Sequence, residues 1–273
     1  MYIHRTGGNC GGWTDRATGE YGDLLDLINV VICGGQRDML PAMQWARQWL
    51  GNESVPARKA KAKPQDDDDA AAIAAARKVW AAAQPITGTL AATYLRARAI
   101  TIDPLPVTLR YAPALLHYDT GLLLPALVAA ISGPDGKVTA VRRVYLRQDG
   151  MGKAAVNAPK MTLGRMRDGA CRLAPAGSTL GIAEGIETAL SAMELKGVPC
   201  WAACGSRLDA ISIPDTVEHL MIFRDGGEPG KLAADRARAA HARPGRSIEI
   251  RTPPAKDWNE HAQRRARIAA GVH

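Results

Sequence analysis

The sequence of 273 residues has a single phenylalanine and no uninterrupted apolar run of about 18 residues. The scarcity of large aromatic side chains argues against an aromatic-rich β-sandwich. The apolar content depends on Ala, Leu, Ile and Val instead, which favours stacked α/β layers. No membrane-spanning helix is expected, and the N-terminus lacks the apolar core of a signal peptide. We therefore expect a cytoplasmic protein without a membrane partner.

Cysteine is also scarce, and no Cys-x-x-Cys pair occurs. The five cysteines are Cys10, Cys33, Cys171, Cys200 and Cys204. An odd number without paired spacing predicts neither a disulfide framework nor an intact zinc site. We therefore expect reduced thiols and no bound zinc.

Positive charge is in excess. The chain has 35 Lys and Arg residues against 27 Asp and Glu residues, a formal net charge of +8. This balance favours an anionic partner, most simply nucleic acid, over the alternative of a general solubility feature.

A charged, proline-containing stretch at residues 53–69 has almost no apolar residues, which is typical of a flexible linker. It separates an N-terminal piece, residues 1–52, from the rest. The aspartate run at its end, residues 66–69, is interpreted as solvated charge rather than a metal site. Helices are expected at residues 70–83 and 87–98.

The region from residue 70 to 175 continues with β-rich and basic segments. Apolar or alternating runs predict strands near residues 109–111, 122–131 and 138–146, and Asp135-Gly136 predicts the hairpin turn between the last two. A basic, loop-rich stretch follows, which binds phosphates or forms solvated surface.

Residues 176–273 alternate between strand and helix patterns. The expected segments are 180–183, 186–195, 198–203, 208–211, 217–223, 231–242, 247–251 and 257–270. Such alternation predicts a Rossmann-like α/β domain with a mainly parallel sheet.

Two carboxylates stand at the ends of two of these strands. Glu184 comes after the run 180–183, and Asp225 comes after the run 217–223. If the strands are neighbours, both acids lie at the carboxyl edge of the sheet, where α/β proteins bind ligands. Two carboxylates with little apolar cover suit a hard cation such as Mg²⁺.

Three motifs resemble the TOPRIM family. They are Glu184-Gly-Ile-Glu-Thr188, the loop from Asp225 to Pro229-Gly230, and Lys256-Asp-Trp-Asn-Glu260. The resemblance is to primase-like TOPRIM proteins of plasmids, phages and other mobile elements. It implies nucleotidyl transfer on a single-stranded DNA template, dependent on Mg²⁺ or Mn²⁺.

The resemblance also implies a metal site. Glu184 and Asp225 are the expected catalytic metal ligands, and Asp257 and Glu228 are additional candidates. Gly227 stands where the family has a second aspartate. For Asp257 the alternative is a helix cap. For Glu187 the alternatives are support of the metal ligands and interaction with the helix dipole.

The basic stretch resembles the subdomain that precedes TOPRIM in bacterial primases. This implies phosphate or template contacts for a set of residues within it. The set is Arg143, Lys153, Asn157, Lys160 and Arg165.

The N-terminal piece resembles the end of a primase zinc ribbon. One Cys and one His, Cys10 and His4, cannot make a four-ligand site. We interpret the piece as a metal-free remnant, or as part of a chain that begins upstream.

Three functions remain open from the sequence. The first is a primase-like polymerase, the second a catalytically weakened TOPRIM protein that binds nucleic acid, and the third a TOPRIM nuclease. No Gly-x-x-x-x-Gly-Lys-Ser/Thr motif occurs, so a helicase partner is expected to be a separate chain.

Overall fold

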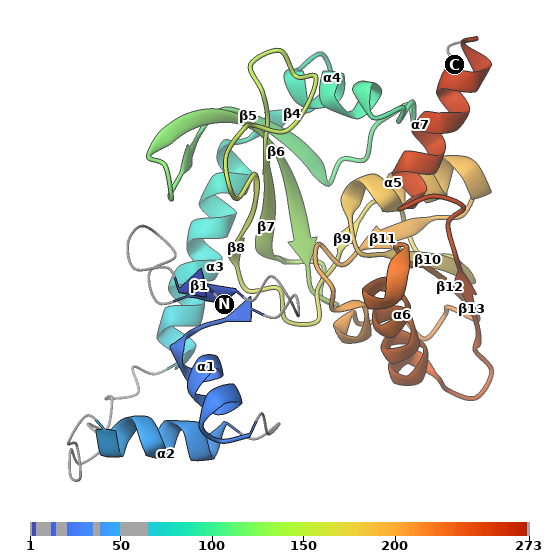
Figure 1. Ribbon diagram of the computed structural model, residues 1–273. Helices are drawn as coiled ribbons and strands as arrows, with labels where there is room; N and C mark the ends of the chain where they lie inside the picture. Colours follow the sequence, from blue (N-terminus) through green and yellow to red (C-terminus); the bar gives the residue numbers. More distant parts are fainter. Residues whose placement is uncertain (1, 4–11, 15–20, 35–38, 50–64, 272–273) are drawn as a thin grey trace. The chain divides into compact units, whose positions relative to one another are not determined.

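The computed structural model describes residues 2–3, 12–14, 21–34, 39–49 and 65–271 (Figure 1). The chain divides into two compact units, Met1–Lys63 and Pro64–His273.

The first unit combines a small sheet with two helices. Strands β1 (Tyr2–Ile3), β2 (Trp13–Thr14) and β3 (Tyr21–Gly22) pair antiparallel, and helices α1 (Leu24–Val31) and α2 (Leu40–Trp49) follow. Asp23 caps α1 by accepting hydrogen bonds from the backbone N–H groups of Leu25 and Asp26. The expected zinc-ribbon remnant is not shown, because Cys10 and His4 lie outside the described residues.

The second unit begins with a helix that starts earlier than expected. Helix α3 spans Gln65–Ala82 and includes the aspartate run that the sequence assigned to the linker. Asp69 forms ion pairs with Arg165 and Arg167, and hydrogen bonds from both guanidinium groups lower the pKa of Asp69. The prediction of solvated charge was therefore wrong at Asp69, because two distant arginines bind it. The remaining expected linker, residues 53–64, lies outside the described residues.

An antiparallel sheet follows, with the strand order β4-β5-β6-β7-β8. Its strands are β4 (Gln84–Pro85), β5 (Leu109–His117), β6 (Leu122–Ser132), β7 (Val138–Tyr145) and β8 (Lys160–Gly164). Helix α4 (Leu90–Ala97) lies between β4 and β5 in the chain. The expected strands and the Asp135-Gly136 turn are present, and Gly136 has the positive φ of 76° that such a turn requires. Strand β8 was not predicted.

The C-terminal sheet has the order β13-β12-β10-β11-β9, and all its pairs are parallel except that of β9 with β11. Its strands are β9 (Cys171–Arg172), β10 (Thr179–Ala183), β11 (Cys200–Ala202), β12 (His219–Phe223) and β13 (Ser247–Arg251). The connecting elements are α5 (Ile186–Lys196), the 3-10 helix η1 (Leu208–Ala210) and α6 (Gly227–His241), and α7 (Trp258–Ala269) ends the fold. The mainly parallel α/β architecture is as predicted.

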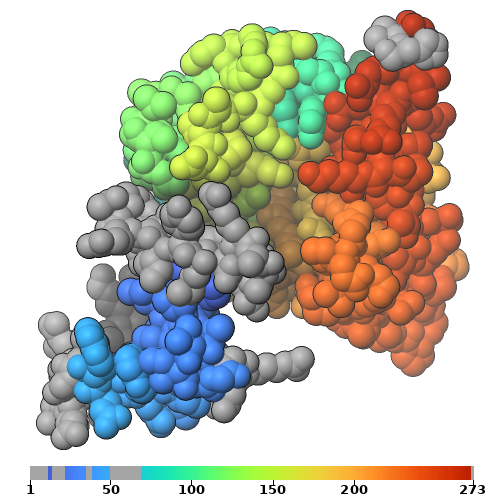
Figure 2. All heavy atoms as spheres, viewed as in Figure 1, coloured from blue at the N-terminus to red at the C-terminus, as the bar shows by residue number. Residues whose placement is uncertain are grey.

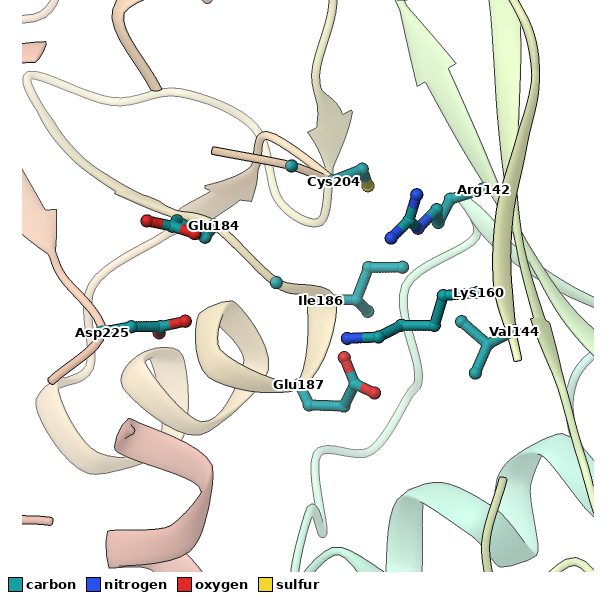
Figure 3. A pocket seen from close by; sticks show the side chains of 10 residues that line it. Arg142, Val144, Lys160, Glu184, Ile186, Glu187, Cys204 and Asp225 are labelled. Carbon is teal, nitrogen blue, oxygen red and sulfur yellow. The ribbon is translucent and has the colours of Figure 1, made fainter. Parts of the chain in front are cut away.

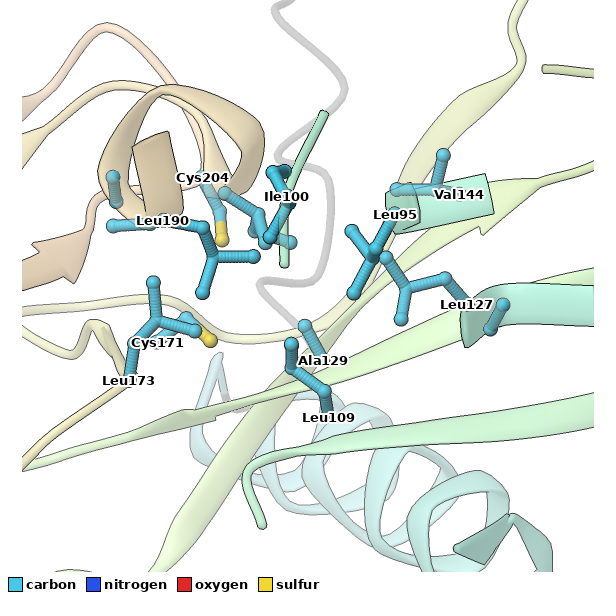
Figure 4. Packing of buried hydrophobic residues seen from close by; sticks show 14 of the residues in the cluster. Leu95, Ile100, Leu109, Leu127, Ala129, Val144, Cys171, Leu173, Leu190 and Cys204 are labelled. Carbon is cyan, nitrogen blue, oxygen red and sulfur yellow. The ribbon is translucent and has the colours of Figure 1, made fainter. Parts of the chain in front are cut away.

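The two large sheets share one hydrophobic core. Buried side chains from α4, β6 and β9 pack together with those of α5, including Leu95, Leu127, Cys171 and Leu190 (Figure 4). In the space-filling view, green-to-yellow atoms of the part that contains strands β5 to β8 lie beside orange-to-red atoms of the C-terminal part (Figure 2). The shared core thus holds the antiparallel sheet against the parallel sheet.

None of the helices in the described ranges combines the length and the apolar character that crossing a bilayer requires.

Gly181 in the middle of β10 is closely packed against neighbouring side chains. A Cβ atom there would lie 2.7 Å from Cε2 of Phe223 and 3.0 Å from Sγ of Cys200. We predict that Gly181→Ala lowers the free energy of unfolding by about 1–3 kcal/mol through overpacking. Urea denaturation measures this change. Gly177→Ala is the matched control, because a Cβ at Gly177 would have no neighbour closer than 3.7 Å. Equal stability of the two variants would contradict the packing described.

Candidate functional site

Two acidic side chains meet at the carboxyl edge of the parallel sheet. Strands β10 and β12 are neighbours, with Ala183 opposite Phe223. Glu184 follows the first strand directly, and Asp225 follows the second after one residue. This register brings both carboxylates to one pocket, as the sequence predicted from two strands that end in acids.

The pocket has a volume of about 210 Å³, and it lies between the two sheets of the second unit. The residues that line it are Arg142, Val144, Lys160, Glu184, Gly185, Ile186, Glu187, Cys204, Gly205 and Asp225. Figure 3 shows the side chains of Glu184 and Asp225 on one side, and those of Arg142 and Lys160 on the other. The pocket therefore has an acidic side and a basic side.

On the acidic side, burial and mutual repulsion make the ionised carboxylates unfavourable. Burial raises the pKa of Glu184, and the neighbouring charge of Asp225 raises it further. Burial also raises the pKa of Asp225, as does the charge of Asp257. Two half-buried carboxylates that repel each other are stabilised by a cation placed between them.

Thr188 partly offsets this repulsion. Its hydroxyl group donates a hydrogen bond of 3.3 Å to Oδ1 of Asp225, which favours the ionised carboxylate and lowers its pKa. Thr188 is buried in the first turn of α5. It was not among the sequence-predicted site residues, and the signal that could have identified it is its place in the first turn of the helix that follows Glu184.

Asp257 lies close enough to act on Asp225 electrostatically, but its carboxylate caps a helix. Oδ1 of Asp257 accepts a hydrogen bond of 2.7 Å from the backbone N–H of Glu260 at the start of α7. Of the two roles considered from the sequence, the structure shows the helix cap. A metal-binding role for Asp257 stays a prediction.

Glu228 and Gly227 differ in position from the expected metal site. Helix α6 begins at Gly227, four residues before the predicted start. The side chain of Glu228 is 69% exposed and lies 3.7 Å from Nζ of Lys231, and it does not line the pocket. Gly227 has a φ of +77°, so an aspartate there would adopt a left-handed conformation.

The predicted phosphate-binding residues separate into different environments. Lys160 lines the pocket, whereas Arg143 is 3% exposed and its guanidinium lies over the ring of Tyr118. Arg142 lines the pocket instead, because adjacent residues on strand β7 point to opposite faces. Arg142 was missed by the sequence reasoning, and the strand alternation was the signal that could have identified it.

The other three residues predicted to contact phosphate do not line the pocket. Lys153 is a mostly buried ammonium paired with Glu187. Asn157 is exposed in the loop before β8. Arg165 forms the ion pair with Asp69 described above. Of this group, the structure therefore places only Lys160 in the lining of the pocket.

Glu187 is a buried carboxylate in the first turn of α5, and it has two side-chain partners. Its Oε1 atom accepts a hydrogen bond of 2.7 Å from the Tyr94 hydroxyl and lies 3.1 Å from Nζ of Lys153. Burial alone would raise the pKa of Glu187. The charges of Lys153 and Lys160, with the hydrogen bond from Tyr94, lower this pKa to about 2.

The donor set fits a magnesium-type cation that is completed by substrate. Within the described ranges no group of three or more His, Cys, Asp or Glu residues is placed to hold a metal ion. Glu184 and Asp225 supply two carboxylates. Mg²⁺ in phosphoryl-transfer sites is commonly held by one or two carboxylates, with water and substrate phosphates as the remaining ligands.

Comparisons with known families match two parts of the chain. Residues 179–267 match the Toprim domain family. Residues 70–173 match a family described as a domain of unknown function, DUF7146. No curated protein matches the chain.

Several solved structures resemble parts of the chain. The primase fragment of the bacteriophage T7 primase-helicase protein is 19% identical, with 54% of this chain and 62% of that chain covered and a TM-score of 0.42. The Aquifex aeolicus primase, with its zinc-binding and RNA polymerase domains, is 14% identical, with 96% and 73% covered and a TM-score of 0.45. A Pseudomonas aeruginosa DNA primase domain is 14% identical, with 84% and 77% covered and a TM-score of 0.40. This chain thus spans less than two thirds of the T7 fragment.

The raised pKa of Glu184 leads to a prediction about stability. An acid with a raised pKa in the folded state destabilises the fold at pH values above that pKa, where it must ionise. We predict that Glu184→Gln raises the melting temperature by about 2 °C near pH 8 in the presence of EDTA. The difference disappears near pH 4, because the wild-type carboxyl is then protonated. Differential scanning calorimetry measures both values.

The matched control is Glu218→Gln, because the side chain of Glu218 is exposed. We expect that variant to have the melting temperature of the wild type at both pH values. A lower melting temperature for Glu184→Gln at pH 8 would show that its charge is not under strain.

Proposed function

We propose that this chain, whose residues 179–267 form a Toprim domain, is a primase-like enzyme that joins nucleotides on a single-stranded DNA template with Mg²⁺ or Mn²⁺. The observation that carries the proposal is the two-sided pocket. It sets Glu184 and Asp225 opposite Arg142 and Lys160. An acidic side for a cation and a basic side for phosphates are the two features that a metal–triphosphate substrate requires.

The acidic side supplies the metal ligands. Glu184 and Asp225 would hold the cation, and the hydroxyl of Thr188 keeps one oxygen of Asp225 oriented. A divalent cation bound there supplies neutralisation of the triphosphate charge and activation of the attacking oxygen.

The basic side binds the substrate phosphates. Arg142 lies on β7 and Lys160 at the start of β8, and the two strands pair side by side. The guanidinium of Arg142 is held in place, because its Nη1 atom donates a hydrogen bond of 2.9 Å to the Thr162 hydroxyl. A guanidinium held in this way binds phosphate at a lower entropic cost than a mobile one.

The wider partners follow from the same proposal. The net charge of +8 supports binding of a single-stranded DNA template. The helicase expected beside a primase would be a separate chain, and replication of a mobile element is the context that the sequence motifs suggest.

A second candidate function is nucleic-acid binding without synthesis. Gly227 favours it, because the position that carries the second family aspartate here has no side chain and has a φ of +77°. In that case the pocket would bind metal and nucleotide too weakly for turnover. A nuclease that uses the same acids is the third reading, and the assay below separates all three.

We predict template-directed primer synthesis by the wild-type chain on single-stranded DNA with ribonucleotides and Mn²⁺ or Mg²⁺. Glu184→Gln is expected to reduce synthesis by about a hundredfold or more, because a ligand of the cation is lost. Glu218→Gln, at an exposed acid away from the pocket, is the matched control and is expected to retain full synthesis. Gel analysis of labelled products measures the yield.

The other outcomes identify the alternatives. DNA cleavage without nucleotides, lost in Glu184→Gln, would indicate the nuclease. Neither synthesis nor cleavage by the wild type, with DNA still bound, would indicate a protein that binds nucleic acid without catalysis. Synthesis that appears only in Gly227→Asp would show an intact scaffold with a weakened metal site.

A further inference from the structure

One oxygen atom of Glu187 joins three segments that are distant in the sequence. Glu187 lies in the first turn of α5, three residues after Glu184, and is 6% exposed. Its Oε1 atom contacts the hydroxyl of Tyr94 from α4 at 2.7 Å and the ammonium of Lys153, from the loop before β8, at 3.1 Å. We call these three residues the Glu187 cross-link.

The cross-link is charged and desolvated. Tyr94 is 1% exposed and the side chain of Lys153 is 25% exposed. Burial lowers the pKa of Lys153, and the opposite charge of Glu187 counteracts that shift. An ion pair in such surroundings has a narrow range of geometries, because separating the charges would leave the buried carboxylate of Glu187 without its ammonium partner.

Each end of the cross-link is tied to one side of the pocket. The other carboxylate oxygen of Glu187, Oε2, lies 3.7 Å from where a Cβ on Gly185 would be. It therefore faces the turn that carries Glu184. Lys153 is bridged to Leu146, just after β7, and Lys160 pairs with Val144 of the same strand. Lys153 is thus attached to the strands that present Arg142 and Lys160.

We infer that Glu187 and Lys153, with Tyr94, are positioning residues that fix the acidic side of the pocket relative to the basic side, and that Lys153 serves Glu187 rather than the substrate. This inference rests on the proposed function. A triphosphate that bridges a cation on Glu184 and Asp225 to Arg142 and Lys160 requires a set spacing between the two sides. The shared core joins the sheets, and the cross-link fixes their spacing at the pocket itself.

The alternative is direct contact of Lys153 with phosphate. The two readings predict opposite signs for Glu187→Gln. If Lys153 binds phosphate, loss of the competing carboxylate frees the ammonium, and nucleotide binds more tightly. If the cross-link positions the pocket, the same substitution loosens the spacing, and nucleotide binds more weakly.

The experiment measures the Kd of ATP with Mg²⁺ by calorimetry for the wild type, Glu187→Gln, Lys153→Met and the double variant. The double variant removes one negative and one positive charge, so it has the net charge of the wild type. We expect about a tenfold rise in Kd for each single variant, and about the same rise for the double variant, because residues of one network are not additive. The affinity for Mn²⁺ alone is expected to stay within about twofold, because Glu184 and Asp225 remain.

The contradicting results are distinct. Tighter ATP binding by Glu187→Gln, with weaker binding by Lys153→Met, would assign Lys153 to the phosphates. Unchanged ATP affinity in the double variant, with a lower melting temperature, would make the cross-link only structural. Absence of ATP binding by the wild type would overturn the proposed function itself, and the inference with it.

Tyr94→Phe covers the case in which the charged variants fail to fold. It removes one hydroxyl donor to Oε1 and keeps both charges. We expect about a threefold rise in the Kd of ATP, since Oε1 of Glu187 loses its hydrogen bond from Tyr94 and keeps only its contact with Lys153. An unchanged Kd in a folded Tyr94→Phe protein would also overturn the inference.

Discussion

The repulsion between two half-buried carboxylates is the constraint on which the site depends. Glu184 and Asp225 are brought together because β10 and β12 are adjacent, parallel and in register to their last residues. Backbone hydrogen bonds of the sheet hold this arrangement against the electrostatic cost, which raises the pKa of both acids. A site that is strained without a cation is ready to bind one, which is a common relation between stability and function in proteins.

The antiparallel sheet supplies the basic side chains of the pocket, which the parallel sheet does not provide. The Toprim segment places acids at its own edge, but the cations that face them come from β7 and β8. The two parts are joined by a continuous apolar core and, at the pocket, by the ion pair of Glu187 and Lys153. The proposed function therefore requires both matched regions, because each supplies one side of the pocket.

Local patterns predicted the elements well, and long-range contacts explain what they missed. The strand–turn–helix at Glu184 follows from a short apolar run, a glycine and helical spacing, all of which are local. Asp69 was expected to be solvated because its partners, Arg165 and Arg167, are about a hundred residues away in sequence. To predict that Arg142 and not Arg143 lines the pocket, one must know which face of the strand is turned toward the pocket, and this depends on where the core lies. Strand alternation separates the two arginines, but tertiary structure decides which of them faces the pocket, and it also sets the partners of Asp69.

A crystal structure with Mn²⁺ and a nonhydrolysable nucleoside triphosphate would show directly whether the pocket binds a cation and phosphates on opposite sides. We predict an anomalous scattering peak between the carboxylates of Glu184 and Asp225, with the triphosphate extending from the cation to Arg142 and Lys160. A cation bound elsewhere, or a triphosphate that avoids this pair of basic side chains, would contradict it.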